Sequence, residues 1–252
     1  MITIDLNADV GAAPGVWRLG VDDALLDIIT SAAIACAGPV GHPSTMRRLS
    51  AAAAARKISV GARVGYRDPG RADRQSIEYD LSEVRDDVIA QIAALDGFCR
   101  VAGTRVRFVK PHGALDGTAA VDETQADAVV NAILDYDPTL PVLCRPGSVL
   151  ATVAAQSGLT VIGEGFADRG YLPDGTPVPR RSSGAQVDDP AEVAARALRM
   201  AEHGTVIAVD GSEVPCRIAS IRVGGGSPGA LHRAHRVHAA LTAAGLHPVA
   251  FA

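Results

Sequence analysis

The segment RVRFVKPHGALDG, from Arg105 to Gly117, contains the pattern that sets the fold of this chain. An alternating apolar run ends there at a proline, and glycine and alanine follow, which favours a turn into a helix. A strand followed by a helix is one βα unit of a parallel sheet. Lys110, at the end of this strand, is one of only two lysines in the chain, which makes it a candidate functional residue.

The same kind of unit recurs along the whole chain. Short β-branched runs alternate with longer segments rich in alanine and leucine, which predicts an α/β fold around a parallel sheet. A length of 252 residues fits one β/α-barrel domain covering residues 1–252. The expected strands are residues 2–8, 32–37, 58–64, 106–112, 140–145, 160–167 and 218–224.

Helices and loops are expected between these strands. Residues 81–102 form the clearest helix, since apolar residues recur there at three- and four-residue steps. Ser44 and Asp189, each beside a proline, are predicted to cap the starts of two other helices. The segments 67–79 and 168–189 are rich in Pro, Gly, Asp and Arg, and we expect them to be loops.

Composition and charge limit the partners. A net charge of -4 gives no field that would attract nucleic acid or an anionic membrane. There is no export signal and no long apolar run, so we expect a cytoplasmic protein. Widely spaced cysteines indicate neither a zinc site nor a disulfide framework: they are Cys36, Cys99, Cys144 and Cys216.

Polar residues gather at the ends of four of the expected strands. In a parallel α/β barrel the active site lies at the carboxyl ends of the strands, so residues at these positions carry the most weight. The sequence predicts one polar site at this barrel mouth. Its members are Asn7, Asp9, Arg63, Lys110, His112, Glu164, Asp168 and Arg169.

Lys110 and His112 lie two residues apart, and a strand alternates its faces, so both side chains point to one side. A partly desolvated lysine can act as a base, a nucleophile or an anion anchor, and histidine titrates near neutrality. Gly113 permits a close approach of ligand and backbone. Asp9 and Asn7 share a face for the same reason. The alternatives are a rim lysine, a hydrogen-bonded core histidine and an aspartate that caps the next loop.

Two other segments offer weaker signals. The loop FADRGYLPDGTPVPRR places Arg169 and Arg180 where they can close over an anionic ligand, although loop arginines are more often solvated. A glycine cluster in RVGGGSPGALHRAH precedes the last expected helix but matches no nucleotide-binding motif. We expect a solvated face for three histidines on that helix, His232, His235 and His238.

With these motifs established, the sequence resembles the LamB/YcsF family. The stretches that match, in the family's order and over nearly the whole chain, are IDLNADVG, AIAC, PSTMRR, VGARVGYRD, VKPHGAL, FADRGYLPDGTPVPRR, ALRM, DGSEVP and SPGA. The resemblance implies a distorted seven-stranded β/α barrel, similar to polysaccharide deacetylase-type barrels. It also implies the ATP-dependent opening of 5-oxoproline to L-glutamate by the A subunit of a prokaryotic 5-oxoprolinase.

The resemblance adds partners and a co-substrate. It implies work with 5-oxoprolinase subunits B and C, with ATP as co-substrate, and a homo-oligomer is possible. From residue type and position at the mouth, we expect Lys110, His112 and Asp9 to be the catalytic set. We expect the substrate-binding set to be Asn7, Arg63, Gly113, Glu164, Asp168, Arg169 and Arg180.

The sequence also departs from the family pattern at polar positions. Residues that differ from the family's usual Glu, Asn, His, Asp, His, His and Asp are, in that order, Ala12, Ala33, Pro39, His42, Arg63, Gly224 and Gly226. Lost imidazoles and carboxylates remove most metal ligands, so we expect no catalytic metal. Three alternatives stay open: a non-catalytic or binding paralogue, a hydrolase of another cyclic amide, and, by analogy of fold alone, a metal-dependent carbohydrate deacetylase.

Overall fold

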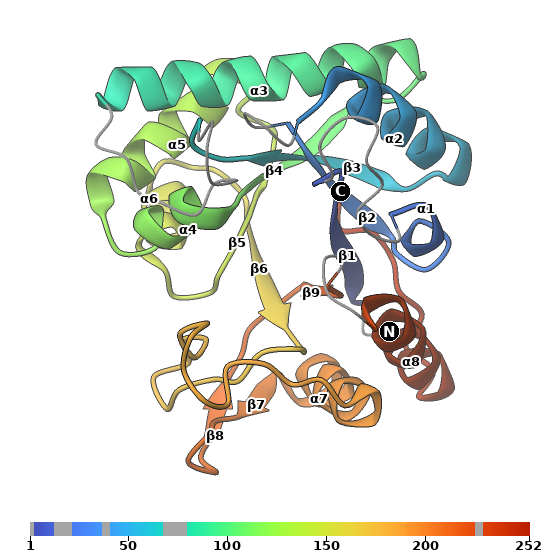
Figure 1. The fold of residues 1–252 in the computed structure, drawn as a ribbon. Coiled ribbons are helices and arrows are strands. Elements are labelled where there is room, and N and C mark those ends of the chain that lie inside the picture. The colour runs from blue at the N-terminus through green and yellow to red at the C-terminus, as the bar shows by residue number, and fades with distance from the viewer. Residues whose placement is uncertain (1–2, 13–21, 37–40, 68–79, 225–228) are drawn as a thin grey trace.

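Seven parallel strands close into a barrel in a computed structural model that describes residues 3–12, 22–36, 41–67, 80–224 and 229–252 (Figure 1). The order around the barrel is β1-β2-β3-β4-β5-β6-β9. The strands are β1 (Asp5–Val10), β2 (Ser31–Ala35), β3 (Ser59–Val64), β4 (Val106–Pro111), β5 (Val142–Cys144), β6 (Val161–Phe166) and β9 (Ser220–Arg222). All seven strands predicted from the sequence are therefore confirmed.

Helices connect the strands and pack against the outside of the barrel (Figure 1). They are α1 (Asp22–Leu25), α2 (Pro43–Arg56), α3 (Leu81–Val101), α4 (Gly113–Ala119), α5 (Glu123–Tyr136), α6 (Val149–Gln156), α7 (Pro190–His203) and α8 (Ala230–Ala243). The main hydrophobic core lies between the strands and these helices and includes Leu6, Val109 and Ile133. None of the described helices is both long and apolar enough to cross a membrane.

The start of α2 differs from the prediction. Pro43 is the first residue of the helix, and His42, not Ser44, is the N-cap. The Nδ1 atom of His42 accepts a hydrogen bond from the backbone N–H of Ser44, at 3.3 Å. The predicted cap at Asp189 is confirmed, since its carboxylate accepts from the first backbone N–H groups of α7. The prediction of a loop at 67–79 lies largely outside the described residues.

An unpredicted hairpin extends the fold beyond β6. Strands β7 (Thr205–Ile207) and β8 (Glu213–Pro215) pair antiparallel and are not part of the barrel. The hairpin, α7 and the predicted loop at 168–189 lie together at the end of β6 (Figure 1). The hairpin was not predicted, although Asp210 and Gly211, a dipeptide typical of hairpin turns, lie between its two strands.

The barrel interior has an apolar floor, which we define as Ala33, Phe108 and Leu143, a cluster separate from the main core. Phe251, close to the C-terminus, packs against it, with its ring centroid 5.0 Å from that of Phe108. On the neighbouring strand Gly61 makes room for the Phe108 ring, because a Cβ at position 61 would lie only 2.1 Å from it. Lys110, two residues beyond Phe108 on β4, faces the same interior one step higher.

Candidate functional site

Lys110 occupies the centre of the barrel mouth and is 3% exposed. Its ammonium nitrogen Nζ lies 2.6 Å from Glu164 Oε1, 2.7 Å from Asp9 Oδ1 and 3.2 Å from Asn7 Oδ1. An ammonium group has three protons to donate, and these three oxygens match them. The residues come from β1, β4 and β6, and the strand alternation turns all four side chains into the barrel.

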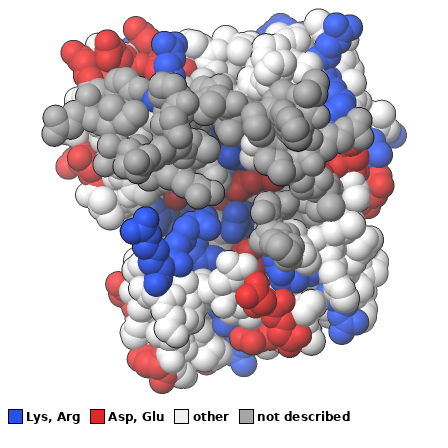
Figure 2. Space-filling model, in the orientation of Figure 1, with Lys and Arg blue, Asp and Glu red and all other residues white. Residues whose placement is uncertain are grey.

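Asp9 connects the lysine to two further groups. Its Oδ2 accepts a hydrogen bond from Arg222 Nη1 at 3.2 Å and lies 3.6 Å from His112 Nδ1. The amine, the imidazole and the first carboxylate therefore meet in one place, as expected from the sequence. Lys and Arg side chains lie next to Asp and Glu side chains near the centre of one face of the molecule (Figure 2).

The two carboxylates on Lys110 titrate in opposite directions. Burial raises the pKa of Asp9, but the charges of Lys110, His112 and Arg222 outweigh it and hold that pKa well below its usual value. For Glu164 burial prevails, and its pKa is raised although Lys110 opposes the shift. The mouth thus pairs a carboxylate that stays ionised with one that takes up a proton more readily, a common arrangement in acid–base sites.

His112 is held in its neutral form. Burial and the charge of Arg63 lower its pKa to about 3, and Asp9 only partly opposes the shift. Its side chain is 24% exposed, so the ring reaches the mouth surface. Arg63 is buried and pairs with Lys110 in the register of β3 and β4. The imidazole is therefore neutral near pH 7, and the low pKa makes it a weak base.

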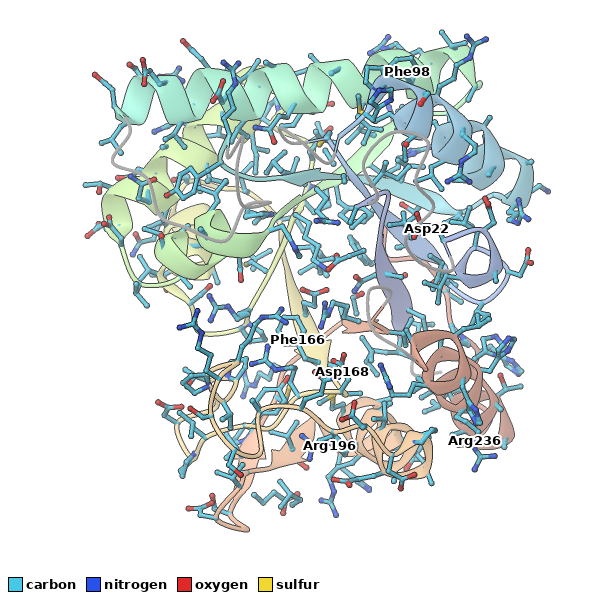
Figure 3. The ribbon with its side chains drawn as sticks, in the orientation of Figure 1. Asp22, Phe98, Phe166, Asp168, Arg196 and Arg236 are labelled. Atoms are coloured by element: carbon cyan, nitrogen blue, oxygen red, sulfur yellow. The ribbon has the colours of Figure 1, made fainter. Side chains whose placement is uncertain are left out.

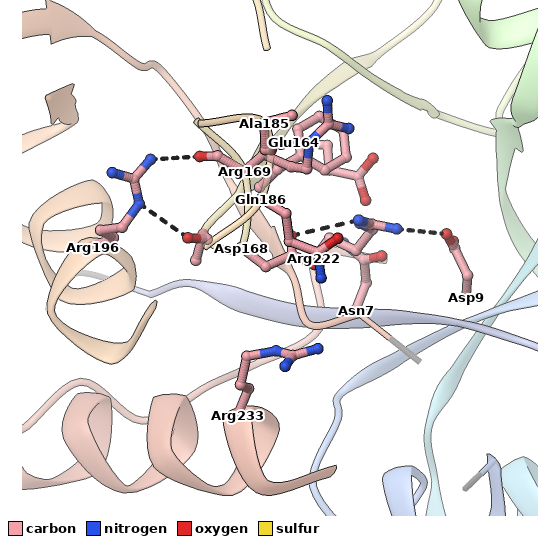
Figure 4. Close-up of polar contacts among 12 residues, drawn as sticks. Asn7, Asp9, Glu164, Asp168, Arg169, Ala185, Gln186, Arg196, Arg222 and Arg233 are labelled. Carbon is pink, nitrogen blue, oxygen red and sulfur yellow. Dashed lines mark hydrogen bonds and ion pairs between the residues drawn. The ribbon is translucent and has the colours of Figure 1, made fainter. Parts of the chain in front are cut away.

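Arg222 is a member of the site that the sequence analysis missed. Its guanidinium lies between Asp9 and Asp168, with Nη2 3.5 Å from Asp168 Oδ1 (Figure 4). The guanidinium carbon is 5.1 Å from the centre of the Phe166 ring. The charges of Asp168, Asp9 and Glu164 outweigh burial and raise the pKa of Arg222. The alternation that singled out Lys110 also applied here, since Ser220 and Arg222 flank the outward Ile221 on β9.

Asp168 lies just beyond the end of β6, where the chain leaves the barrel (Figure 3). Arg169 is the next residue. The guanidinium of Arg169 donates to the backbone carbonyls of Val178 and Ala185, so it joins two parts of the 168–189 loop. Arg196 of α7 in turn donates to the carbonyls of Ala167 and Arg169 (Figure 4). Through these contacts Arg169 shapes the loop, and its predicted role in substrate binding stays a prediction.

The remaining predicted residues lie around this centre. Gly113 is exposed and has a φ of 64°, a conformation that favours glycine, as β4 passes into α4. Arg180 is exposed on the loop, and its charge contributes to lowering the pKa of Arg169. On the last helix His232 and His235 are exposed and His238 is partly exposed, in line with the expected solvated face. The glycine cluster lies mostly outside the described residues.

The departures from the family pattern can be placed in part. Ala33 packs in the apolar floor, and His42 caps α2. Gly224 follows β9, and a Cβ at this position would lie 2.8 Å from Asp168 Oδ2. Any larger residue at 224, including the family's usual histidine, therefore requires the Asp168 carboxylate to move. Positions 39 and 226 lie outside the described residues.

The donor set for a metal is limited. Among the residues that the structure describes, no three His, Cys, Asp or Glu side chains are grouped so that they could hold an ion. Asp9 and Glu164 bind Lys110 instead. The four cysteines are buried thiols. The expectation that the mouth contains no catalytic metal stays a prediction.

Comparisons with known proteins agree over the whole chain. The sequence profile of the LamB/YcsF family matches residues 4–252. A protein of Mycobacterium avium (strain 104) that bears the name of the A subunit of 5-oxoprolinase is 47% identical over 251 residues, which cover 100% of both chains. One of the same name from Nocardia farcinica is 46% identical and covers 98% of this chain and 99% of that one. A solved structure of a lactam utilization protein from Thermus thermophilus superposes with a TM-score of 0.95 at 37% identity, covering 99% of this chain and 100% of that one. The chain belongs to the LamB/YcsF family.

Proposed function

We propose that this chain is the A subunit of a 5-oxoprolinase, which with subunits B and C hydrolyses 5-oxo-L-proline to L-glutamate at the expense of ATP. The observation that carries the proposal is the cluster of Lys110, Asp9, Glu164 and His112 at the barrel mouth. It occurs in a chain that matches proteins of that name along their full length.

The reaction requires ATP because the ring amide has to be activated before water can attack it. Amide resonance makes the ring carbonyl of 5-oxoproline a poor electrophile. Transfer of the γ-phosphoryl group of ATP to that oxygen releases ADP and makes the ring carbon electrophilic. Water then attacks the carbon, the ring C–N bond breaks as the nitrogen takes up a proton, and hydrolysis of the resulting acyl phosphate by a second water gives glutamate and phosphate. Binding of ATP to the purified chain, measured with and without its partners, decides which subunit holds the nucleotide.

Lys110 suits an electrostatic role in this chemistry better than that of a free nucleophile. Its three hydrogen-bond directions are taken by Asn7, Asp9 and Glu164, so it acts as a fixed positive charge. Preorganised charges of this kind stabilise negative charge that develops on a carbonyl or phosphoryl oxygen. Arg222 adds a second fixed positive charge across Asp9.

His112 is the side chain best placed to accept a proton from the attacking water. It is neutral, it reaches the mouth surface, and Asp9 Oδ2 lies 3.6 Å from Nδ1. Glu164, whose raised pKa makes it the readier proton carrier, suits protonation of the leaving ring nitrogen. The raised pKa supports the role of Glu164, whereas the role of His112 rests on its position at the mouth, because a lowered pKa makes the imidazole a weaker base.

A second candidate is a related protein that acts on another cyclic amide or binds an acid without turnover. Arg63 and Arg222 add fixed positive charge to the mouth, which favours a more anionic ligand than 5-oxoproline. Genes resembling subunits B and C beside the gene for this chain would favour the first candidate, and their absence the second.

The direct test is reconstitution. The purified chain is mixed with subunits B and C, 5-oxoproline and ATP, and glutamate and ADP are measured together. We expect both products in equal amounts, and we expect loss of both with Lys110→Ala or His112→Ala. Glutamate formation unchanged in these two variants would remove the residues from the mechanism.

A matched control comes from the chain's other lysine. Lys57 is exposed at the end of α2. Lys57→Arg is expected to turn over like the unmodified chain, whereas Lys110→Arg is expected to lose activity, because a guanidinium does not fit the three-oxygen pocket. Binding of 5-oxoproline without turnover, or turnover of other lactams only, would favour the second candidate.

A further inference from the structure

A chain of buried hydrogen bonds runs from Lys110 down into the barrel. Asn7 Oδ1 accepts from Lys110, and Asn7 Nδ2 donates to Ser220 Oγ at 2.8 Å. The Ser220 hydroxyl donates in turn to Asp5 Oδ2. Asn7, Ser220 and Asp5 are each fully buried. Asp5 thus lies two hydrogen-bonded residues away from the lysine and touches no reacting group.

The other oxygen of Asp5 is also used. Oδ1 accepts hydrogen bonds from the hydroxyls of Thr30 and Ser31, the latter at 2.7 Å. Three donated hydroxyl bonds favour the ionised carboxylate, which accepts at both oxygens, and they oppose the raised pKa that burial gives Asp5. The series of hydrogen bonds therefore has an acceptor, Asp5, at one end and a donor, Lys110, at the other.

The side-chain amide of Asn7 can adopt two orientations, and only one of them directs its oxygen toward Lys110. An acceptor at Asp5 makes Ser220 donate downward, so the lone pairs of Ser220 face Asn7 and require its NH₂ group there. The amide oxygen must then point at the lysine. The direction of each bond in the chain follows from the carboxylate at its lower end.

We propose that Asp5 is a positioning residue, which acts through Ser220 to fix the Asn7 amide so that its oxygen holds the Lys110 ammonium between Asp9 and Glu164. The proposal deepens the function proposed above, and its kinetic test rests on that function. Its spectroscopic test does not.

Asp5→Asn reverses the donor and acceptor roles along this series of hydrogen bonds without changing the shape of the side chain. The new side-chain oxygen stays with Thr30 and Ser31, so its NH₂ group meets Ser220. Ser220 then accepts from below and donates to Asn7, whose amide turns over. An NH₂ group now faces the ammonium of Lys110, and the lysine loses one of its three acceptors.

The loss of an acceptor by Lys110 can be measured because the protein contains only two lysines. In the full-length protein labelled with ¹⁵N-lysine, protons of the exposed Lys57 exchange rapidly with water, whereas the buried Lys110 gives an observable ammonium resonance. Lys110→Arg assigns it. We expect Asp5→Asn to speed the exchange of these protons about tenfold or more, the effect of losing a hydrogen bond to a charged group.

A second variant guards against a folding defect. Ser220→Ala leaves Asp5 bound to Thr30 and Ser31 but removes the link to Asn7, and it is expected to speed the exchange as well. Exchange within twofold of the unmodified protein in both variants, with the fold intact by circular dichroism, would overturn the proposal.

The double variant Asp5→Asn/Asn7→Asp provides a rescue. Both oxygens of an aspartate at 7 accept hydrogen bonds, so the lysine finds an acceptor whichever way the chain runs, and the net charge is unchanged. Slow exchange should return. If Asp5 only supported packing, the additional change at Asn7 would not slow the exchange. Exchange in the double variant as fast as in Asp5→Asn would therefore refute the positioning role.

Kinetics separate the two proposals. We expect kcat for 5-oxoproline to fall about tenfold in Asp5→Asn, with KM nearly unchanged, and to recover in part in the double variant. Slowed exchange that depends on Asp5, in a protein that turns over no 5-oxoproline, would leave the positioning intact and refute the function. Turnover of 5-oxoproline, with exchange rates that do not change in Asp5→Asn, would support the proposed function and refute the positioning role.

Discussion

The floor and the mouth of the barrel interior meet on β4, one step apart, and have opposite chemistry. The floor, Ala33, Phe108 and Leu143, is an apolar cluster. In the mouth Lys110 binds two carboxylates and an amide oxygen. On β4 one intervening residue, Val109, separates the two regions. Along β4 the interior therefore changes from packing to charge within a single strand alternation.

This difference shows which residues serve stability. Burying apolar side chains stabilises the fold, whereas a buried ion pair roughly offsets its own desolvation. The cluster at Lys110 contributes little net stability, although removing one member leaves the others unpaired. Its retention in a buried position is explained better by chemistry at the mouth than by folding.

The largest effect is expected in the floor. Phe108→Ala removes a fully buried ring and leaves a cavity beside Gly61 and Leu143, which should lower the free energy of unfolding by about 3 to 5 kcal/mol. Urea unfolding followed by circular dichroism measures it. Arg107→Ala, the exposed neighbour on the same strand, is the control and should change stability by less than about 0.5 kcal/mol. Equal losses in the two variants would contradict a packed floor.

Lys110→Met tests the mouth by the same measure. The variant removes the cation between the carboxylates of Asp9 and Glu164 and leaves only Arg222 beside Asp9, which should cost about 3 kcal/mol of stability at neutral pH. Turnover should fall by a factor of about 100 to 1,000. Because both carboxylates can be neutralised by protons, stability should recover toward acid pH. A loss that does not vary with pH would contradict the ion-pair interpretation.

Arg222→Gln is expected to have a smaller effect, since Lys110 still compensates Asp9. Loss of the charged hydrogen bonds to Asp9 and Asp168 should cost about 1.5 to 3 kcal/mol. Arg180→Ala, on the exposed loop, is the comparison and should leave stability within about 0.5 kcal/mol. If only the Arg180 variant raises KM, the loop and not Arg222 binds the anionic part of the substrate.

The pH dependence gives the most specific signal. The pKa of His112 is about 3 in the fold, below its ordinary value of 6.5. Between these values the unfolded chain binds a proton that the folded chain does not. The contribution is therefore complete above about pH 6.5 and is lost as the pH falls toward 3, at no more than about 1.4 kcal/mol per pH unit. The depressed pKa of Asp9 acts in a separate window, below pH 3.8.

Replacing His112 by Asn should flatten this slope. Unfolding free energies from urea titrations between pH 4 and pH 7 would show it. An identical slope in the variant would mean that the folded protein already takes up a proton at His112 in this range.

Most of the barrel followed from the sequence, and so did the meeting of Lys110, His112 and Asp9. Strand alternation is a local property, and the carboxyl ends of parallel strands meet at one edge. Arg222 was not singled out in the sequence, although its alternation with Ile221 contained the signal. The capping of α2 by His42 depends on the geometry beside Pro43, and the β7–β8 hairpin was overlooked although Asp210 and Gly211 lie at its turn.

The sequence by itself determined the seven strands, the exposed histidines of α8 and the face on which each mouth residue lies, because hydrophobic periodicity is written residue by residue. Only the tertiary structure decided that Asp9 is shared by Lys110, His112 and Arg222, that Arg169 joins parts of its own loop, and that Asp5 is linked to Lys110. These facts depend on distances between β1, β4, β6 and β9, and strand periodicity contains no information about which side-chain atoms meet across a closed barrel.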